Sequence, residues 1–150
     1  MIFPILRMII GLFFLLVSLE KLLEPYQNFL YVVQSYQLFP SLLEEAVARV
    51  VPWVQFFLGL FLFLGLWVKN ILKGLVILIV GFLGVVGQAL IRKLPLDECG
   101  CFGSLISLPP RKTFLLDITL LVFTVILFRR IKETSGWSLD AYFEMENSVK

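Results

Sequence analysis

Residues 50–91 read VVPWVQFFLGLFLFLGLWVKNILKGLVILIVGFLGVVGQALI, two long apolar runs interrupted by Lys69 and Asn70. Each run is long enough to cross about 30 Å of hydrocarbon as a helix that rises about 1.5 Å per residue. Because only two polar residues separate the runs, 50–68 and 71–91 are predicted to be antiparallel transmembrane helices joined by a tight turn. This stretch places the chain among membrane proteins with several spans.

Two further apolar stretches, residues 2–19 and 112–129, lie on either side of this pair. The predicted fold class is therefore all-α, an antiparallel bundle of four transmembrane helices that occupies residues 1–132. The first stretch is interpreted as a retained span and not as a signal peptide, because no charged residue precedes it and no small-residue cleavage site follows Leu19. Residues 133–150 are predicted to be a polar cytoplasmic tail.

The composition excludes several classes of protein. Of the 150 residues, 59% are hydrophobic and 16% are charged, which is more apolar surface than a soluble domain of this length can bury. The net charge is only +2 and no basic stripe is present, so a nucleic-acid partner is not expected. The chain has no histidine, which excludes bis-histidine haem, histidine-ligated zinc or copper, and catalysis by imidazole.

The connection between the first two spans is rich in aromatic residues, which is typical of a segment at the level of the lipid headgroups. We therefore predict an interfacial outer segment here. Ser41-Leu-Leu-Glu44 matches a capping box, which predicts a helix that starts at Ser41 and continues into the second span. The aromatic residues are Tyr26, Phe29, Tyr31, Tyr36 and Phe39.

The distribution of basic residues suggests an orientation in the membrane. Lys69, Lys73 and the run Arg129-Arg130-Ile131-Lys132 lie at one end of the predicted bundle. The positive-inside rule assigns this end to the cytoplasm, although the opposite end also carries basic residues. We therefore predict a multi-pass protein of the bacterial inner membrane, with both termini in the cytoplasm and the connection between the last two spans on the periplasmic side.

Each predicted span carries a polar or charged side chain near its outer end. These residues are Ser18 and Lys21, Gln55, Gln88, and Asp117. Polar groups are costly in hydrocarbon and need partners or a function. One interpretation is a structural network of hydrogen bonds and ion pairs, and the other is the lining of a small cavity.

Two further features of the apolar runs have structural interpretations. Arg7 lies toward the inner leaflet, where its side chain is expected to extend to the headgroups. The glycines of the second and third spans are predicted to let helix backbones approach closely. These glycines are Gly59, Gly65, Gly74, Gly81, Gly84 and Gly87.

The two cysteines of the chain stand one residue apart in the last outer connection, as Cys99-Gly100-Cys101-Phe102-Gly103. A disulfide between Cys99 and Cys101 would close a small, strained ring, and strain makes a disulfide easier to reduce. Glycine at position 100 relieves the backbone restriction of that ring. Phe102 and Gly103 would hold the loop at the bilayer surface and leave room for a partner.

Three interpretations of the cysteine pair stay open. The first is thiol–disulfide exchange, for which Arg92 and other nearby cations would favour a thiolate. The second is a structural disulfide or two inert thiols. The third is a metal site, which is weak because two thiolates without histidine provide at best a linear copper(I) site, so no metal is predicted.

The chain resembles the methylamine-utilisation protein MauE family, within the broader DoxX-like group of four-helix membrane proteins. The resemblance runs in order from Leu6 to about Leu121. Family members tend to have glutamate where this chain has Gln55, and a small residue where it has Leu19. The matching motifs are Leu6-Arg7, Ser18-Leu-Glu-Lys21, Phe29, Tyr36-Gln-Leu-Phe39-Pro40, Pro52, Ala89-Leu-Ile-Arg92 and Cys99-Gly-Cys-Phe-Gly103.

The resemblance implies a role in maturing a periplasmic, disulfide-rich partner. In the family's namesake, that partner is the small subunit of methylamine dehydrogenase, and a thioredoxin-like protein assists. If the family's glutamate handles a proton, Gln55 cannot do so here. Sequences of this family also occur outside methylamine metabolism, so the substrate does not transfer with the resemblance.

The leading hypothesis is a membrane protein that supports thiol–disulfide chemistry in a periplasmic thioredoxin-like or disulfide-rich partner. Cys99 and Cys101 would be the exchanging pair, Arg92 and Lys21 would give electrostatic support, and Gln55, Gln88 and Asp117 would line the site. A quinone or a second thiol protein would accept the electrons, although no motif identifies a quinone site. Whether the chain is itself an enzyme stays open. The alternative is a non-catalytic subunit or assembly factor with a structural loop disulfide.

Overall fold

The computed structural model describes residues 2–93, 109–134 and 142. The Cys-Gly-Cys loop and nearly all of the predicted tail lie outside these residues. The elements of the described part are helices, which confirms the all-α prediction. They are α1 (Ile2–Leu23), α2 (Tyr26–Ser35), α3 (Ser41–Leu64), α4 (Val68–Ile91), α5 (Pro110–Arg129) and α6 (Ile131–Thr134).

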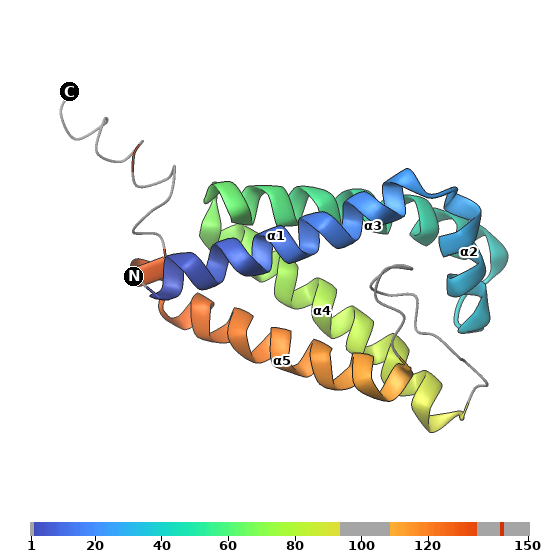
Figure 1. The fold of residues 1–150 in the computed structure, drawn as a ribbon. Helices are drawn as coiled ribbons and strands as arrows, with labels where there is room; N and C mark the ends of the chain where they lie inside the picture. The colour runs from blue at the N-terminus through green and yellow to red at the C-terminus, as the bar shows by residue number, and fades with distance from the viewer. Residues whose placement is uncertain (1, 94–108, 135–141, 143–150) are drawn as a thin grey trace.

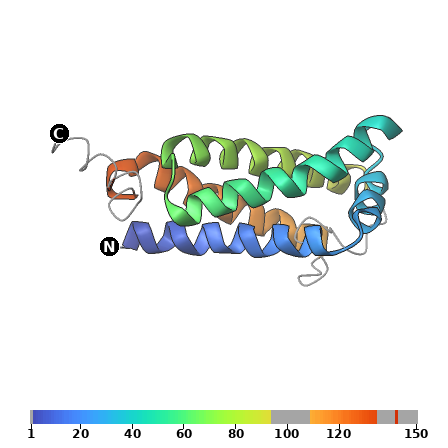
Figure 2. The ribbon, with the colours of Figure 1, turned by 90° about the horizontal axis from the view of Figure 1, so that it is seen from above.

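The long helices pack mainly as two pairs, α1 against α3 and α4 against α5 (Figures 1 and 2). The short helix α2 lies at the end of the molecule far from the N-terminus, where it packs on α3. At the opposite end, α6 contacts α1 and α5. Two clusters of buried apolar side chains join the pairs, one around Phe14, Leu62 and Leu75 and the other around Val17 and Val86.

Three of the helices, α1, α3 and α4, are long and apolar enough to cross a membrane. This finding supports the membrane class. Helix α5, which covers the predicted fourth span, does not meet the same criterion, because every stretch of 18 residues in it holds three charged side chains. A bundle of four spans therefore stays a prediction.

The turn between α3 and α4 differs from the prediction. Helix α3 ends before Gly65, whose φ of 73° and ψ of 36° form a left-handed C-cap, and α4 begins at Val68. Lys69 and Asn70 therefore lie within the first turn of α4 and not in the connection. The physical reason is that glycine adopts the left-handed conformation without steric cost and so ends a helix even within an apolar run.

The helix that starts at Ser41 does continue into the second span, as predicted, and contains Pro52. The predicted capping box is wrong. Pro40 is the N-cap residue, no side chain caps the helix, and Ser41 is its first helical residue. A capping hydroxyl has to be carried by the N-cap residue, and Pro40, with its extended backbone, occupies that position in place of Ser41.

The backbones of α1 and α3 approach each other closely at two glycines. A Cβ atom built on Gly59 would lie 2.7 Å from the backbone nitrogen of Leu15, and one built on Gly11 would lie 2.6 Å from the backbone nitrogen of Phe63. The prediction of close packing is thus confirmed at Gly59. It is wrong for Gly81 and Gly84, around which a Cβ atom would meet nothing within 4 Å.

The structure also corrects the interpretation of Arg7. Its side chain does not extend to the headgroups but is fully buried, and its Nη1 donates a hydrogen bond to the carbonyl oxygen of Thr134 at 2.9 Å. The hydroxyl of Thr134 donates in turn to the carbonyl oxygens of Leu127 and Arg130. A cation is stabilised there because the carbonyl groups at a helix C-terminus carry partial negative charge.

Candidate functional site

A buried lysine and a buried glutamine meet between α1 and α3, at the end of the molecule where α2 lies. The Nζ of Lys21 donates a hydrogen bond to Oε1 of Gln55 at 3.4 Å. Lys21 is 5% exposed and Gln55 is fully buried. The pair is therefore a positive charge held inside the protein and not a solvated surface group.

Helical periodicity explains why these two side chains face each other. On α1, Phe14, Val17 and Lys21 follow the spacing of one helix face, and all three are buried. On α3, Gln55 and Gly59 are four residues apart and are also buried. Because the backbones are already close at Gly59, the polar pair one turn away is brought into contact.

Two aromatic rings also lie close to the lysine. The Nζ of Lys21 lies 4.6 Å from the ring centroid of Phe29 on α2 and 5.5 Å from that of Phe82 on α4. Aromatic faces attract cations, by about 2 kcal/mol when the pair is removed from water. These contacts bring four helices to one ammonium group. From the sequence, Phe29 was expected at the headgroup level, and neither ring was identified as a partner of Lys21.

The polar residues predicted near the outer ends of the spans, Ser18, Lys21, Gln55, Gln88 and Asp117, are called the polar layer here. Its other members also lie toward the end of the molecule where α2 lies. Asp117 on α5 is 1% exposed and Ser18 is fully buried, whereas Gln88 is half-buried. Ser18 bonds within its own helix, since its hydroxyl donates to the carbonyl oxygen of Leu15 at 2.8 Å. Of these residues, the structure shows Lys21 and Gln55 in contact, and the gathering of all of them at one level stays a prediction.

Two buried amide atoms in this layer have no hydrogen-bond partner among the residues that the structure describes. They are Nε2 of Gln55 and Oε1 of Gln88. A buried polar atom without a partner costs about 1–3 kcal/mol, so native structures satisfy such atoms with protein groups, water or a ligand. These two amide groups therefore have unused hydrogen-bonding capacity, one as a donor and one as an acceptor.

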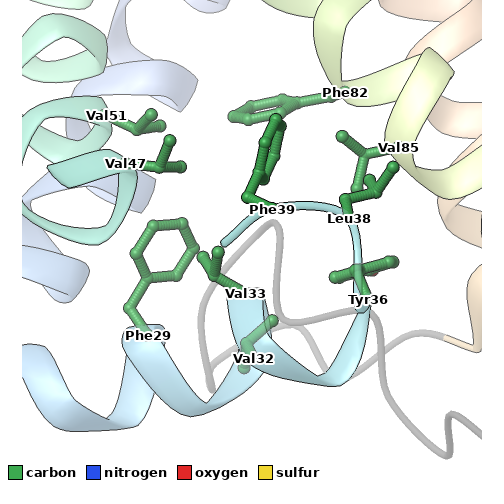
Figure 3. Close-up of a pocket in the computed structure, with 10 residues that line it drawn as sticks. All are labelled: Phe29, Val32, Val33, Tyr36, Leu38, Phe39, Val47, Val51, Phe82 and Val85. Carbon is green, nitrogen blue, oxygen red and sulfur yellow. The ribbon is translucent and has the colours of Figure 1, made fainter. Parts of the chain in front are cut away.

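An apolar cavity lies beside the polar layer (Figure 3). Its volume is about 60 Å³, and it opens between α2, α3 and α4. Phe29 and Phe82, the two rings over Lys21, are also part of its wall. The other lining residues are Val32, Val33, Tyr36, Leu38, Phe39, Val47, Val51 and Val85.

The cysteine loop enters and leaves the described structure at this same end. The described part of the chain stops after Lys93, just beyond α4, and resumes at Pro109, just before α5 (Figure 1). Arg92, predicted to support the cysteines, is the exposed C-cap residue of α4. Cys99, Gly100, Cys101, Phe102 and Gly103 lie outside the described residues, so their roles stay predictions.

The comparisons with known proteins identify one relationship. The family model described as methylamine utilisation protein MauE matches residues 1–130, which is most of the chain. No curated protein and no solved structure matches.

Proposed function

This chain belongs to the methylamine utilisation protein MauE family, and we propose that it supports thiol–disulfide exchange in a periplasmic partner protein. Cys99 and Cys101 are the exchanging pair in this proposal, and the partner is a thioredoxin-like or disulfide-rich protein. We further propose that α5 is a fourth span, which completes an antiparallel bundle in the inner membrane with both termini in the cytoplasm.

The observation that carries the proposal is the buried polar layer around Lys21. A fixed ammonium group at the end of the molecule where the cysteine connection begins and ends would stabilise a nearby thiolate, which is the form in which a cysteine leaves when its disulfide is attacked. Gln55 and the two aromatic rings hold this charge in place. The unused donor of Gln55 and acceptor of Gln88 provide further groups that could bind a polar ligand or the loop itself.

The proposed exchange proceeds in two displacements. A thiolate of the partner attacks one sulfur of the Cys99–Cys101 disulfide, which breaks that bond and forms a mixed disulfide. The partner's second thiolate then attacks the partner's sulfur in the mixed disulfide and releases the sulfur of this chain as a thiolate. The partner thereby gains a disulfide, and this chain is left with two thiols. Two electrons and two protons have then passed to this chain, and a quinone or a second thiol protein must accept them before the next cycle.

Replacing both cysteines with serine tests the proposal. We expect the double variant to insert and fold as the parent does, while the disulfides of the co-expressed partner fail to form. Thr119→Ser serves as a control, because Thr119 is exposed and lies outside both the cysteine loop and the polar layer. If the partner matures normally with the serine variant, exchange is excluded, and the non-catalytic assembly factor becomes the better description.

Labelling with a membrane-impermeant thiol reagent tests the orientation. In intact spheroplasts, we expect Cys99 and Cys101 to react only after a reductant is added, because a periplasmic pair at rest would be a disulfide. Labelling that requires lysis of the cells would place the loop in the cytoplasm and contradict the proposal.

A further inference from the structure

A second apolar depression lies between α4 and α5, at the end of the molecule opposite α2. Its volume is about 320 Å³, which falls within the range of sites for small ligands. Lys73, Val76 and Ile77 line it from α4, and Val125 and Phe128 line it from α5. It is therefore an apolar groove with one charged residue among those that form it.

Basic residues continue the groove beyond its apolar part. Lys69 precedes Lys73 by four residues on α4, and Arg129 follows Val125 by four residues on α5, so each lies on the face of its helix that forms the groove. All three basic side chains are exposed, and the structure gives none of the three an acidic partner within its described residues. Residues 64–74 and 124–132 contain no aspartate or glutamate. The end of the groove is thus strongly cationic.

The cationic end and the apolar walls of the groove together indicate which kind of ligand fits it. An apolar groove between α4 and α5 suits an acyl chain if α5 is the proposed fourth span, on which this inference rests, and exposed lysine and arginine at its end suit a phosphate group. A second copy of this chain would bring a second group of cations to the same place, which repulsion disfavours. A phosphate group without an acyl chain would leave the apolar walls unoccupied.

We infer that the groove between α4 and α5 is a binding site for one anionic phospholipid. One acyl chain lies along Val76, Ile77, Val125 and Phe128, and the headgroup phosphate lies at Lys73, with Lys69 and Arg129 nearby. The site is independent of the proposed thiol chemistry, because it uses other residues at the other end of the molecule.

Native mass spectrometry of the full-length protein tests this inference. The protein is released from detergent micelles that contain equal amounts of phosphatidylglycerol and phosphatidylcholine with identical acyl chains. We expect the adduct with one phosphatidylglycerol to predominate, and Lys73→Gln to reduce this preference about fivefold, as is typical for the loss of one cation near an anionic headgroup. Lys112→Gln makes the same change of charge at the opposite end of α5 and is expected to leave the preference intact.

A second pair of variants tests the acyl-chain part of the groove. Val125→Trp fills the groove and is expected to remove the adduct, whereas Ile126→Trp adds the same ring on an exposed part of α5 that does not line the groove and is expected to retain it. Equal binding of the two lipids, or equal effects of the two lysine variants, overturns the inference. Retention of the adduct by a folded Val125→Trp overturns it as well. If that variant does not fold, the comparison of the two lysine variants decides.

Discussion

Replacement of Gly59 by alanine should separate the two most closely packed helices of this protein. The added Cβ atom would lie 2.7 Å from the backbone nitrogen of Leu15 and 3.1 Å from both the carbonyl oxygen of Gly11 and the carbonyl carbon of Phe14. Non-bonded carbon atoms pack best at about 3.5–4.0 Å, so α1 and α3 would have to move apart by roughly 1 Å. None of the three atoms can rotate away, because all belong to the backbone of α1.

The expected magnitude follows from two opposing contributions. Overpacking costs about 1–3 kcal/mol, and the upper end applies where only backbone atoms are in contact. Alanine favours a helix over glycine by about 1 kcal/mol, which offsets part of this cost. We therefore expect Gly59→Ala to lower the free energy of unfolding by about 2 kcal/mol, and Gly11→Ala to act similarly, since its Cβ would lie 2.6 Å from the backbone nitrogen of Phe63.

Gly81→Ala is the matched control, because its Cβ would meet nothing within 4 Å. This variant should be as stable as the parent or more stable by up to about 1 kcal/mol. The measurement is reversible unfolding by sodium dodecyl sulfate in mixed micelles, followed by tryptophan fluorescence. If Gly59→Ala and Gly81→Ala have the same unfolding midpoint, α1 and α3 do not approach as described, and the position of the polar layer is in doubt as well.

Variants of two further residues, Arg7 and Gln55, test buried polar contacts. Arg7→Leu removes the donor to the carbonyl oxygen of Thr134 and should destabilise the protein by about 1–3 kcal/mol, with faster tryptic cleavage after Arg129 and Arg130. The control Arg49→Leu breaks an exposed ion pair of 2.6 Å with Glu45 and should cost at most about 0.5 kcal/mol. Equal cleavage rates of the two variants would contradict the described burial of Arg7. Gln55→Leu removes the acceptor for Lys21 and should lower the free energy of unfolding by about 1–3 kcal/mol. Gln55→Glu keeps an oxygen acceptor for the ammonium group and should unfold at a higher detergent concentration than Gln55→Leu. The reverse order would show that the side chains of Lys21 and residue 55 are not in contact.

The polar layer shows which properties of a site can be predicted from the sequence and which cannot. Hydropathy gives the depth of a residue along a span, so the sequence alone assigns Lys21, Gln55 and Asp117 to one level. Depth does not reveal which faces of the helices meet. The contact of Lys21 with Gln55 depends on the rotation of α1 and α3, which is constrained by close packing at Gly11 and Gly59. The positions of the two rings depend in addition on how α2 and α4 are placed.

The predictions that were wrong also depended on tertiary contacts that the sequence does not show. A glycine that permits close packing and a glycine on an open face look alike in the sequence, so Gly59 and Gly81 received the same prediction. Arg7 was expected to reach the headgroups, because a buried arginine needs acceptors such as the carbonyl groups at a helix end. The sequence does not show that Thr134, at the end of α6, lies beside α1 and provides such an acceptor. The position of the turn before α4 depended on Gly65, whose left-handed backbone outweighs the polarity of Lys69 and Asn70.

By itself, the sequence determined that this chain is helical and belongs to a membrane, because these properties follow from composition and from the distance needed to cross a bilayer. It also predicted polar groups at one level of the spans. The tertiary structure alone decided which of those groups touch, where the cavity and the basic groove lie, and why Arg7 can be buried. These features depend on how each helix is rotated about its axis, and that rotation is set by steric contact between residues far apart in the chain.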